Sequence, residues 1–231
     1  MKYKRILLKL SGECLGKENA GGIDFDKVLE TCEEIKKISK SVQIGIVVGG
    51  GNFWRGRSNQ YMDRPTADSV GMLATIMNSL VLSDAFRQIG VDTKVLTSIE
   101  VNKVAEVFTK EKANHAFSQG KIVIFAGGTG NPCFSTDTAA SLRAIEIDAD
   151  VILKGTNVDG VYDKDPNKYE DAVMYDEISY QEVLIKQLKV MDLTAISMCM
   201  ENDMPIIVYN MNDKNNLNKI IKGKPIGTKV K

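Results

Sequence analysis

The sequence predicts an α/β fold in which a mostly parallel β-sheet carries helices on both faces. Short apolar runs recur along the chain, at residues 6–10, 44–48, 93–96, 122–126, 151–153 and 206–209, and four of them end in glycine. Their hydrophobicity is continuous rather than alternating, which is typical of strands covered on both faces. Segments with helical spacing of apolar residues fill the intervals between these runs.

The predicted helices alternate with these strands. In the first of them Phe25, Val28 and Cys32 share one face, and Asp24 is a candidate N-cap. We expect further helices near residues 68–88, 101–118, 136–147, 179–188, 192–201 and 215–221. In an open sheet of this kind, ligands bind beyond the carboxyl ends of the strands, which is where the glycines fall.

Length and composition are those of an ordinary globular protein. The 231 residues suffice for one sizeable core, and no linker divides them, so we expect a single domain over residues 1–231. Thirty basic residues balance thirty acidic ones, which does not favour nucleic acid or an anionic membrane as a partner. The apolar run at 6–10 is too short for a signal peptide or a membrane span.

Cysteine and histidine usage excludes several classes of site. The four cysteines form no C-x-x-C pair, which favours free thiols in a reducing cytoplasm. His115 is the only histidine, so Ser-His-Asp catalysis and histidine-rich metal centres are disfavoured, and we predict no metal-ligating residues. No G-x-x-x-x-G-K-[ST] motif occurs, and the segment 128–133 does not complete G-x-G-x-x-G, which excludes a P-loop and disfavours a Rossmann dehydrogenase.

One stretch joins a strand, a glycine-rich turn and a helix. The apolar run 122–126 leads into the turn 127–132, and a helical pattern opens at Asp137. Backbone N–H groups of such a turn, together with a helix N-terminus, present positive charge at one point. The hydroxyls of Thr129 and Ser135 lie in the same stretch. The stretch is predicted to bind a phosphorylated ligand.

Three cations stand beside glycine turns at strand ends: Lys9, Arg55 and Lys154. Any one of them alone is best interpreted as a solvated side chain, but three in this position favour convergence on phosphates. Phosphoryl transfer depends on positioning and charge neutralisation by such groups with Mg²⁺, so it needs no histidine. By residue type Asp192 is a helix N-cap. Tyr162, between two turn signals, is either a base-stacking residue or the surface tyrosine of a hairpin tip.

Several segments are similar to the motifs of the bacterial uridylate kinases, within the amino acid kinase family. They are Lys9-Leu10-Ser11-Gly12-Glu13, Gly49-Gly50-Gly51-Asn52-Phe53-Trp54-Arg55-Gly56, Gly71-Met72-Leu73-Ala74-Thr75, Thr129-Gly130-Asn131-Pro132, Val158-Asp159-Gly160-Val161-Tyr162 with Asp165-Pro166, and Lys189-Val190-Met191-Asp192-Leu193. Their order and spacing extend the resemblance from Lys4 to about Thr228. The fourth and last segments are the most specific to the uridylate members.

The resemblance implies a fold and a reaction. The fold is a three-layer αβα sandwich around a mostly parallel sheet. The reaction transfers the γ-phosphoryl group of ATP, with Mg²⁺, to UMP, giving ADP and UDP in pyrimidine nucleotide biosynthesis. Members of that family are typically homohexamers, and GTP and UTP are the expected effectors.

The resemblance also assigns roles by motif position. Lys9 would contact the transferring phosphoryl group, Asp192 would orient Lys9, and Arg55 would lie on the transfer side; these three form the predicted catalytic set. The predicted ATP site comprises Lys9, Leu10, Ser11, Gly12, Gly51, Arg55, Thr156, Tyr162 and Asp165. The predicted UMP site comprises Gly50, Asp68, Thr129, Gly130, Asn131, Pro132, Cys133, Phe134, Ser135 and Thr136. Asp137 would help to organise the metal or the phosphates.

Two residues depart from the family's pattern, and two other functions remain open. Cys14 and Cys133 stand where alanine and a bulky aromatic residue are more usual, and neither thiol carries the expected chemistry.

A kinase of the same fold could instead act on a small acid such as glutamate or carbamate. A regulatory module could bind uridine nucleotides without catalysis, although retention of both Lys9 and Asp192 argues against it.

Overall fold

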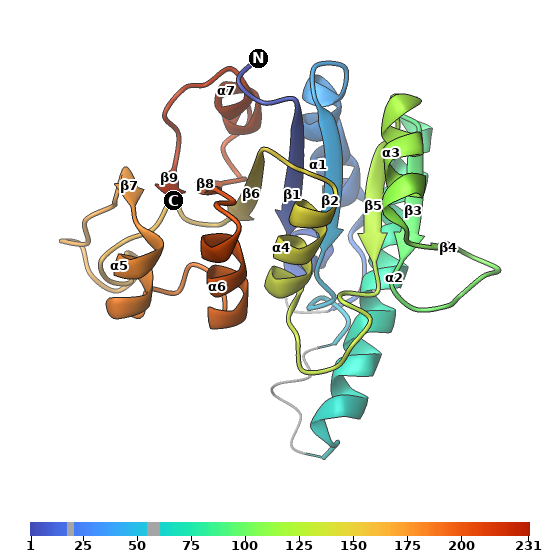
Figure 1. The fold of residues 1–231 in the computed structure, drawn as a ribbon, viewed down its shortest axis with the longest axis horizontal. Helices are drawn as coiled ribbons and strands as arrows, with labels where there is room; N and C mark the ends of the chain where they lie inside the picture. The colour runs from blue at the N-terminus through green and yellow to red at the C-terminus, as the bar shows by residue number, and fades with distance from the viewer. Residues whose placement is uncertain (18–20, 55–60) are drawn as a thin grey trace.

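A computed structural model describes residues 1–17, 21–54 and 61–231. Its strands form one sheet in the order β4-β3-β5-β2-β1-β6-β8-β9-β7 (Figure 1). The strands are β1 (Arg5–Leu10), β2 (Gln43–Val48), β3 (Thr93–Thr97), β4 (Glu106–Val107), β5 (Ile122–Ala126), β6 (Val151–Thr156), β7 (Glu177–Ile178), β8 (Ile206–Asn210) and β9 (Thr228–Val230). The pairing of β8 with β9 is antiparallel, and the other pairings among the described strands are parallel. The predicted mostly parallel sheet is therefore confirmed.

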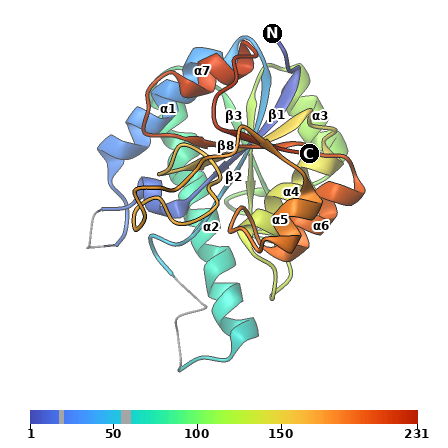
Figure 2. The same cartoon turned by 90° about the vertical axis from the view of Figure 1, so that its left-hand side faces the viewer.

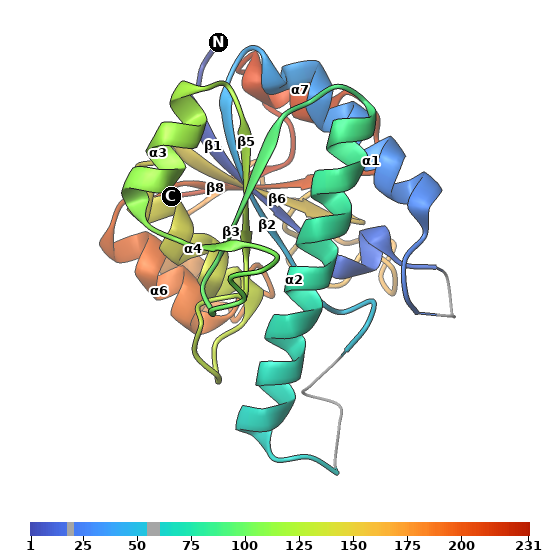
Figure 3. The ribbon, with the colours of Figure 1, turned by 90° about the vertical axis from the view of Figure 1, so that its right-hand side faces the viewer.

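Helices cover both faces of this sheet, as Figures 2 and 3 show. They are α1 (Phe25–Ser39), α2 (Arg64–Gln88), α3 (Lys110–Ser118), α4 (Thr136–Glu146), α5 (Tyr180–Ile185), α6 (Leu193–Glu201) and α7 (Asn216–Ile221), with a short 3₁₀ helix, η1 (Gly12–Leu15). On one face Ile6 and Leu8 of β1 share a buried cluster with residues of α1, α2 and α7. On the other, Leu7 joins a cluster with residues of α3, α4, α5 and α6. This alternation confirms the predicted αβα sandwich, because successive side chains of a strand point to opposite faces.

Most predicted helices begin and end close to the expected residues. Asp24 caps α1, accepting a hydrogen bond from the backbone of Lys27. The helix predicted to begin at residue 68 begins at Arg64, because Asp63 caps it and a proline stands in its first turn. By length and composition α2 could be considered as a membrane span, but half of its most apolar window is buried. It packs on α1 and on strands of the sheet, as a core helix does.

The helix predicted over residues 101–118 was wrong in its first half. The helix begins only at Lys110, with Thr109 as its N-cap, and Glu106–Val107 form the edge strand β4 beside β3. β-Branched and aromatic residues gather just before Thr109, and such residues favour extended backbone. The short strands β7 and β9 also escaped prediction, because two or three residues carry no periodicity that can be read.

Candidate active site

A cavity of about 1150 Å³ lies at the carboxyl ends of β1 and β6. The predicted ATP-site residues among its lining are Lys9, Leu10, Ser11, Gly51 and Thr156, and Lys154 joins them. Since β1 and β6 are adjacent and parallel, with Lys9 in register with Lys154, both lysines reach the same edge of the sheet. The site thus lies where ligands bind in open α/β sheets.

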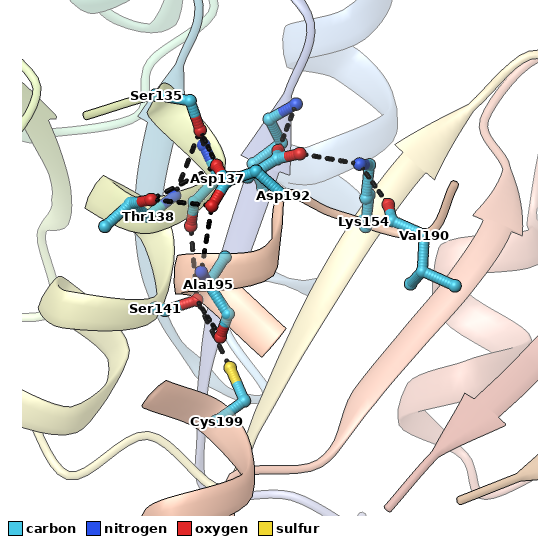
Figure 4. A network of polar contacts seen from close by, with 10 residues as sticks. Ser135, Asp137, Thr138, Ser141, Lys154, Val190, Asp192, Ala195 and Cys199 are labelled. Atoms are coloured by element: carbon cyan, nitrogen blue, oxygen red, sulfur yellow. Dashed lines mark hydrogen bonds and ion pairs between the residues drawn. The ribbon is translucent and has the colours of Figure 1, made fainter. Parts of the chain in front are cut away.

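Asp137, in the first turn of α4, stands between the two lysines. Lys9 Nζ lies 2.7 Å from Asp137 Oδ1, and Lys154 Nζ donates a hydrogen bond of 2.9 Å to Asp137 Oδ2. Lys154 also donates to the carbonyl oxygen of Val190 (Figure 4). The three charged side chains are only 12%, 16% and 14% exposed, in the order Lys9, Asp137, Lys154. Two cations therefore share one carboxylate in a site that largely excludes water.

Burial and charge act in opposite directions on these groups. Burial alone would raise the pKa of Asp137, but Lys9 and Lys154 together hold this pKa below its usual value. For Lys154, burial lowers the pKa, and the attraction of Asp137 offsets part of that effect. The lowered pKa of Lys154 shows that burial outweighs the attraction of Asp137, so an incoming polyphosphate meets a lysine that is already desolvated.

One oxygen of Asp137 is incompletely satisfied. The close contact of the buried Oδ1 is with Lys9, and no second hydrogen-bond partner of this oxygen lies among the residues described. In residues 1–17, 21–54 and 61–231, no group of three or more His, Cys, Asp or Glu side chains is placed to hold a metal. Mg²⁺ usually binds through one or two carboxylates plus substrate phosphates. Asp137 therefore fits a magnesium ion carried by a nucleotide.

Asp192 caps a helix, as its residue type predicts. Its carboxylate caps α6 by accepting a hydrogen bond of 2.9 Å from the backbone of Ala195. It also accepts from the hydroxyls of Ser135 and Thr138, at the start of α4 (Figure 4). The predicted N-cap is confirmed. The carboxylate that pairs with Lys9 is that of Asp137, and the orientation of Lys9 by Asp192 stays a prediction. Asp192 thus fastens the first turn of α4 to α6.

The glycine turn after β2 packs closely against its neighbours. A Cβ on Gly12 would lie 2.5 Å from the carbonyl oxygen of Gly49, and a Cβ on Gly50 would lie 2.8 Å from Cβ of Ala74. Both approaches are shorter than any side chain allows, so glycine is required at these two positions. Gly12 is consequently buried beneath the turn and does not line the cavity.

An asparagine pair that sequence reasoning missed supports the same turn. Asn52 and Asn78 exchange side-chain hydrogen bonds of 3.0 and 2.7 Å, and Asn78 also donates to the carbonyl oxygen of Gly49. Asn78 is fully buried in α2. Asn78 is a polar residue inside an apolar helical pattern, and this could have indicated the pair from sequence, because the amide of a buried asparagine needs hydrogen-bond partners.

The predicted UMP segment lies between α2 and α4. Asp68 of α2 accepts a hydrogen bond of 2.8 Å from the backbone of Cys133, whose φ is 73°. Thr129 and Asn131 close a small turn with each other. Cys133 and Ser135 also line a second cavity, of about 660 Å³, together with residues of α5 and α6. The structure thus brings Asp68 to the predicted segment across 65 residues of sequence.

Some predicted residues stand apart. Tyr162 and Asp165 do not line the large cavity; Tyr162 forms an isolated antiparallel bridge with Met174, and Asp165 accepts a hydrogen bond from the backbone of Asn167. Their assignment to the ATP site stays a prediction. Arg55 lies outside the described residues.

Known proteins define the class to which this fold and site belong. The amino acid kinase family matches residues 4–210. The chain belongs to the amino acid kinase family.

Within that family the chain is similar along its whole length to UMP kinases of known structure. The crystal structure of UMP kinase from Ureaplasma parvum is 40% identical, with a TM-score of 0.93 over 100% of this chain and 99% of the other. UMP kinase from Bacillus anthracis is 34% identical, with a TM-score of 0.96 over 100% and 96%. Uridylate kinase from Archaeoglobus fulgidus is 28% identical, with a TM-score of 0.74 over the full length of both chains.

Proposed function

We propose that this protein is a UMP kinase, which transfers the γ-phosphoryl group of ATP to UMP and releases ADP and UDP. The full-length similarity to UMP kinases at 34% and 40% identity supports this function. The observation that carries it is the buried arrangement of Lys9, Asp137 and Lys154 at the carboxyl ends of adjacent strands. Two cations held at fixed positions suit the charge that develops as a phosphoryl group passes between two oxygens.

Each member of this arrangement has a separate task. Lys9 and Lys154 neutralise charge on the phosphates, and Asp137 sets the positions of both. The fixed geometry means that little reorganisation is needed when charge moves, which is how preorganised groups lower a barrier. Mg²⁺ bound with ATP would supply further positive charge on the phosphate oxygens. Asp137 is the carboxylate that would hold it, through Oδ1, whose one close partner is Lys9.

The acceptor binds along the segment 129–136, with Gly50 and Asp68 beside it. Gly50 lies against α2 because it has no side chain, which leaves the turn backbone within reach of the acceptor phosphate. Asp68, already joined to the backbone of Cys133, offers a carboxylate for ribose hydroxyls. Backbone groups of the segment form hydrogen bonds with the polar edge of uracil. A site built from such groups strongly rejects a base whose donors and acceptors differ. Leu10, Ser11, Gly51 and Thr156 line the ATP side, and Gly12 supports it from beneath the turn. Arg55, Tyr162 and Asp165 are assigned to the same side by the resemblance alone.

The remaining features concern assembly and setting. One domain over residues 1–231 forms a homohexamer, and the exposed apolar residues Leu73 and Met77 of α2, 51% and 45% exposed, supply a surface that such an assembly would cover. GTP and UTP act as its effectors. All four cysteines are free, which suits a reducing cytoplasm. There the enzyme serves pyrimidine nucleotide biosynthesis.

The test is ADP release from ATP with Mg²⁺, with UMP, CMP, AMP, GMP, glutamate and carbamate supplied separately. We expect turnover with UMP and background rates with the other acceptors. Turnover with a small acid would overturn the acceptor assignment while keeping a kinase. Tight binding of uridine nucleotides with no ADP release from any acceptor would show a nucleotide sensor instead.

A further inference from the structure

A buried arginine lies behind the acceptor segment, and the proposed reaction does not use it. The side chain of Arg143, in α4, is 6% exposed. Its Nη1 pairs with Glu146, and its guanidinium carbon lies 4.1 Å from the ring centre of Phe108. Its Nε is buried and has no hydrogen-bond partner in the described part of the chain. Burying a guanidinium costs free energy of desolvation, so each hydrogen bond that compensates this cost matters. Arg143 makes one further contact of this kind.

That remaining contact leads to the glycine-rich loop. Arg143 Nη2 donates a hydrogen bond of 2.9 Å to Ser98 Oγ, and Ser98 Oγ donates one of 2.8 Å to the carbonyl oxygen of Gly128. A hydroxyl that accepts from a cation becomes a stronger donor, because hydrogen bonds in a chain polarise one another. The charge of Arg143 is thus relayed through Ser98 to one peptide group of the loop.

The same short segment after β3 shapes the loop sterically. Gly130 has a φ of 83°, and a Cβ there would lie 2.9 Å from the carbonyl oxygen of Ser98. Gly127 has a φ of 77°, and its N–H donates a hydrogen bond of 2.9 Å to Thr75 Oγ1 of α2. The loop therefore contacts Ser98 on one side and α2 on the other.

We infer that Arg143 and Ser98 are positioning residues for the acceptor nucleotide, acting by fixing the peptide group between Gly128 and Thr129. A trans peptide is planar, and its C=O and N–H point in opposite directions. Holding the Gly128 carbonyl toward Ser98 therefore aims the Thr129 N–H away from Ser98. That N–H donates to no backbone carbonyl in the described residues, which leaves it available to the ligand.

This inference rests on the proposed function, because the loop is part of the proposed UMP site. Wild-type turnover with UMP tests that function by itself. The inference is tested by Ser98→Ala, with Ser118→Ala as the control. Ser118 donates only to the carbonyl oxygen of His115 in its own helix, α3, so its loss removes a serine hydroxyl without touching the loop.

For Ser98→Ala we expect the KM for UMP to rise about tenfold, the size expected when a hydrogen bond to a charged group is lost. The kcat and the KM for ATP should stay within about twofold of wild type, because the change removes acceptor binding and not transition-state charge stabilisation. Ser118→Ala should match wild type in all three. An unchanged KM for UMP in Ser98→Ala, or an equal rise in both KM values, would overturn the inference, provided that wild type turns over UMP.

A double variant tests whether Arg143 acts through Ser98. Arg143→Lys keeps the charge, but a single ammonium cannot reproduce the fork that reaches both Ser98 and Glu146. If the relay exists, Ser98→Ala with Arg143→Lys raises the KM for UMP no further than the larger single change. If the double variant instead raises the KM for UMP by the product of the two single effects, Arg143 and Ser98 act independently and the relay is rejected. If Arg143→Lys does not fold, amide hydrogen exchange at Gly130 and Asn131 in Ser98→Ala decides: faster exchange supports the inference, and unchanged exchange overturns it.

Discussion

The two sides of the active site are built in different ways. On the phosphate side, Lys9, Asp137 and Lys154 come from β1, α4 and β6, and all three are at most 16% exposed. On the acceptor side Phe134 is 49% exposed, and Cys133 takes part mainly through backbone groups, as in its contact with Asp68. One side is a buried charge arrangement, and the other is a shaped loop.

This difference matches two different demands. A phosphoryl group in transfer looks the same whatever the acceptor, so fixed charges serve it well. Choosing one base requires hydrogen bonds of definite direction, which a loop backbone can supply once its peptides are fixed. We therefore expect changes on the phosphate side to lower kcat and changes on the acceptor side to raise the KM for UMP. The predictions below test that division.

The largest effect is expected from Asp137→Asn. Neutralising this carboxylate leaves two buried ammonium groups close together without an anion, and removing one partner of a buried pair costs about 3–5 kcal/mol. We expect kcat to fall about 1000-fold as both lysines leave their positions, which corresponds to a loss of about 4 kcal/mol of transition-state charge stabilisation. Steady-state kinetics with ATP and UMP would measure this.

Asp148→Asn is the matched control for that experiment. Asp148 follows α4, is 69% exposed, and pairs with Lys110 at the surface. An exposed pair of this kind contributes about 0–1 kcal/mol, so this variant should keep wild-type kinetics. If Asp137→Asn also kept a kcat within a few-fold of wild type, the buried arrangement would not be the catalytic centre.

Lys9→Ala should have the next largest effect. It removes one cation but leaves Asp137 paired with Lys154, so the loss of kcat should be about 100-fold, as for a single group that stabilises transition-state charge. The KM for UMP should change little, because Lys9 lies on the phosphate side. Lys94→Ala, which removes a surface lysine paired with Glu106, controls for loss of charge. A rise in the KM for UMP with an intact kcat would show that Lys9 serves acceptor binding and not the transfer of the phosphoryl group.

Asp192→Ala should act on stability more than on kcat. The change removes the cap of α6 and the acceptor for two hydroxyls of α4, and we expect the free energy of unfolding to fall by about 2–3 kcal/mol. Asp192→Asn keeps a capping oxygen and should lose less. Urea unfolding would measure both. A variant that kept wild-type stability but lost as much kcat as Asp137→Asn would show instead that Asp192 acts directly on Lys9.

The sequence predicted most of what local pattern controls. Continuous apolar runs identified the six long strands, and the glycine turns after them placed Lys9 and Lys154 at carboxyl ends of strands. Asp24 and Asp192 were recognisable as caps from residue type and position. These features depend on neighbours within a few residues of one another.

What escaped prediction depends on packing between distant segments. Nothing local shows that α4 lies where Asp137 reaches both lysines rather than the solvent, since that requires β1 and β6 to be adjacent in the sheet. The pairing of Asn52 with Asn78 spans 26 residues. Ser98 is an ordinary polar residue after a strand until the fold brings Arg143 and Gly128 to it. Tertiary contacts, rather than propensities, give these side chains their roles.

The smallest effect, a change of stability with pH, would show whether the phosphate side is held by charge. Because the pKa of Asp137 is lower in the folded protein than its ordinary value of 3.8, folding favours the ionised carboxylate. Its contribution to stability is present above the unfolded pKa and is lost as the pH falls through the folded pKa.

The free energy of unfolding should therefore fall more steeply below about pH 4 in wild type than in Asp137→Asn, whose side chain cannot take up that proton. Urea unfolding from about pH 6 to about pH 3 gives the two curves, and other carboxylates cancel in their difference. Asp148→Asn should follow wild type, since it leaves the buried carboxylate in place. If the free energy of unfolding changes with pH equally in wild type and Asp137→Asn, the lysines do not hold Asp137 ionised. The phosphate side would then differ from the acceptor side in burial alone.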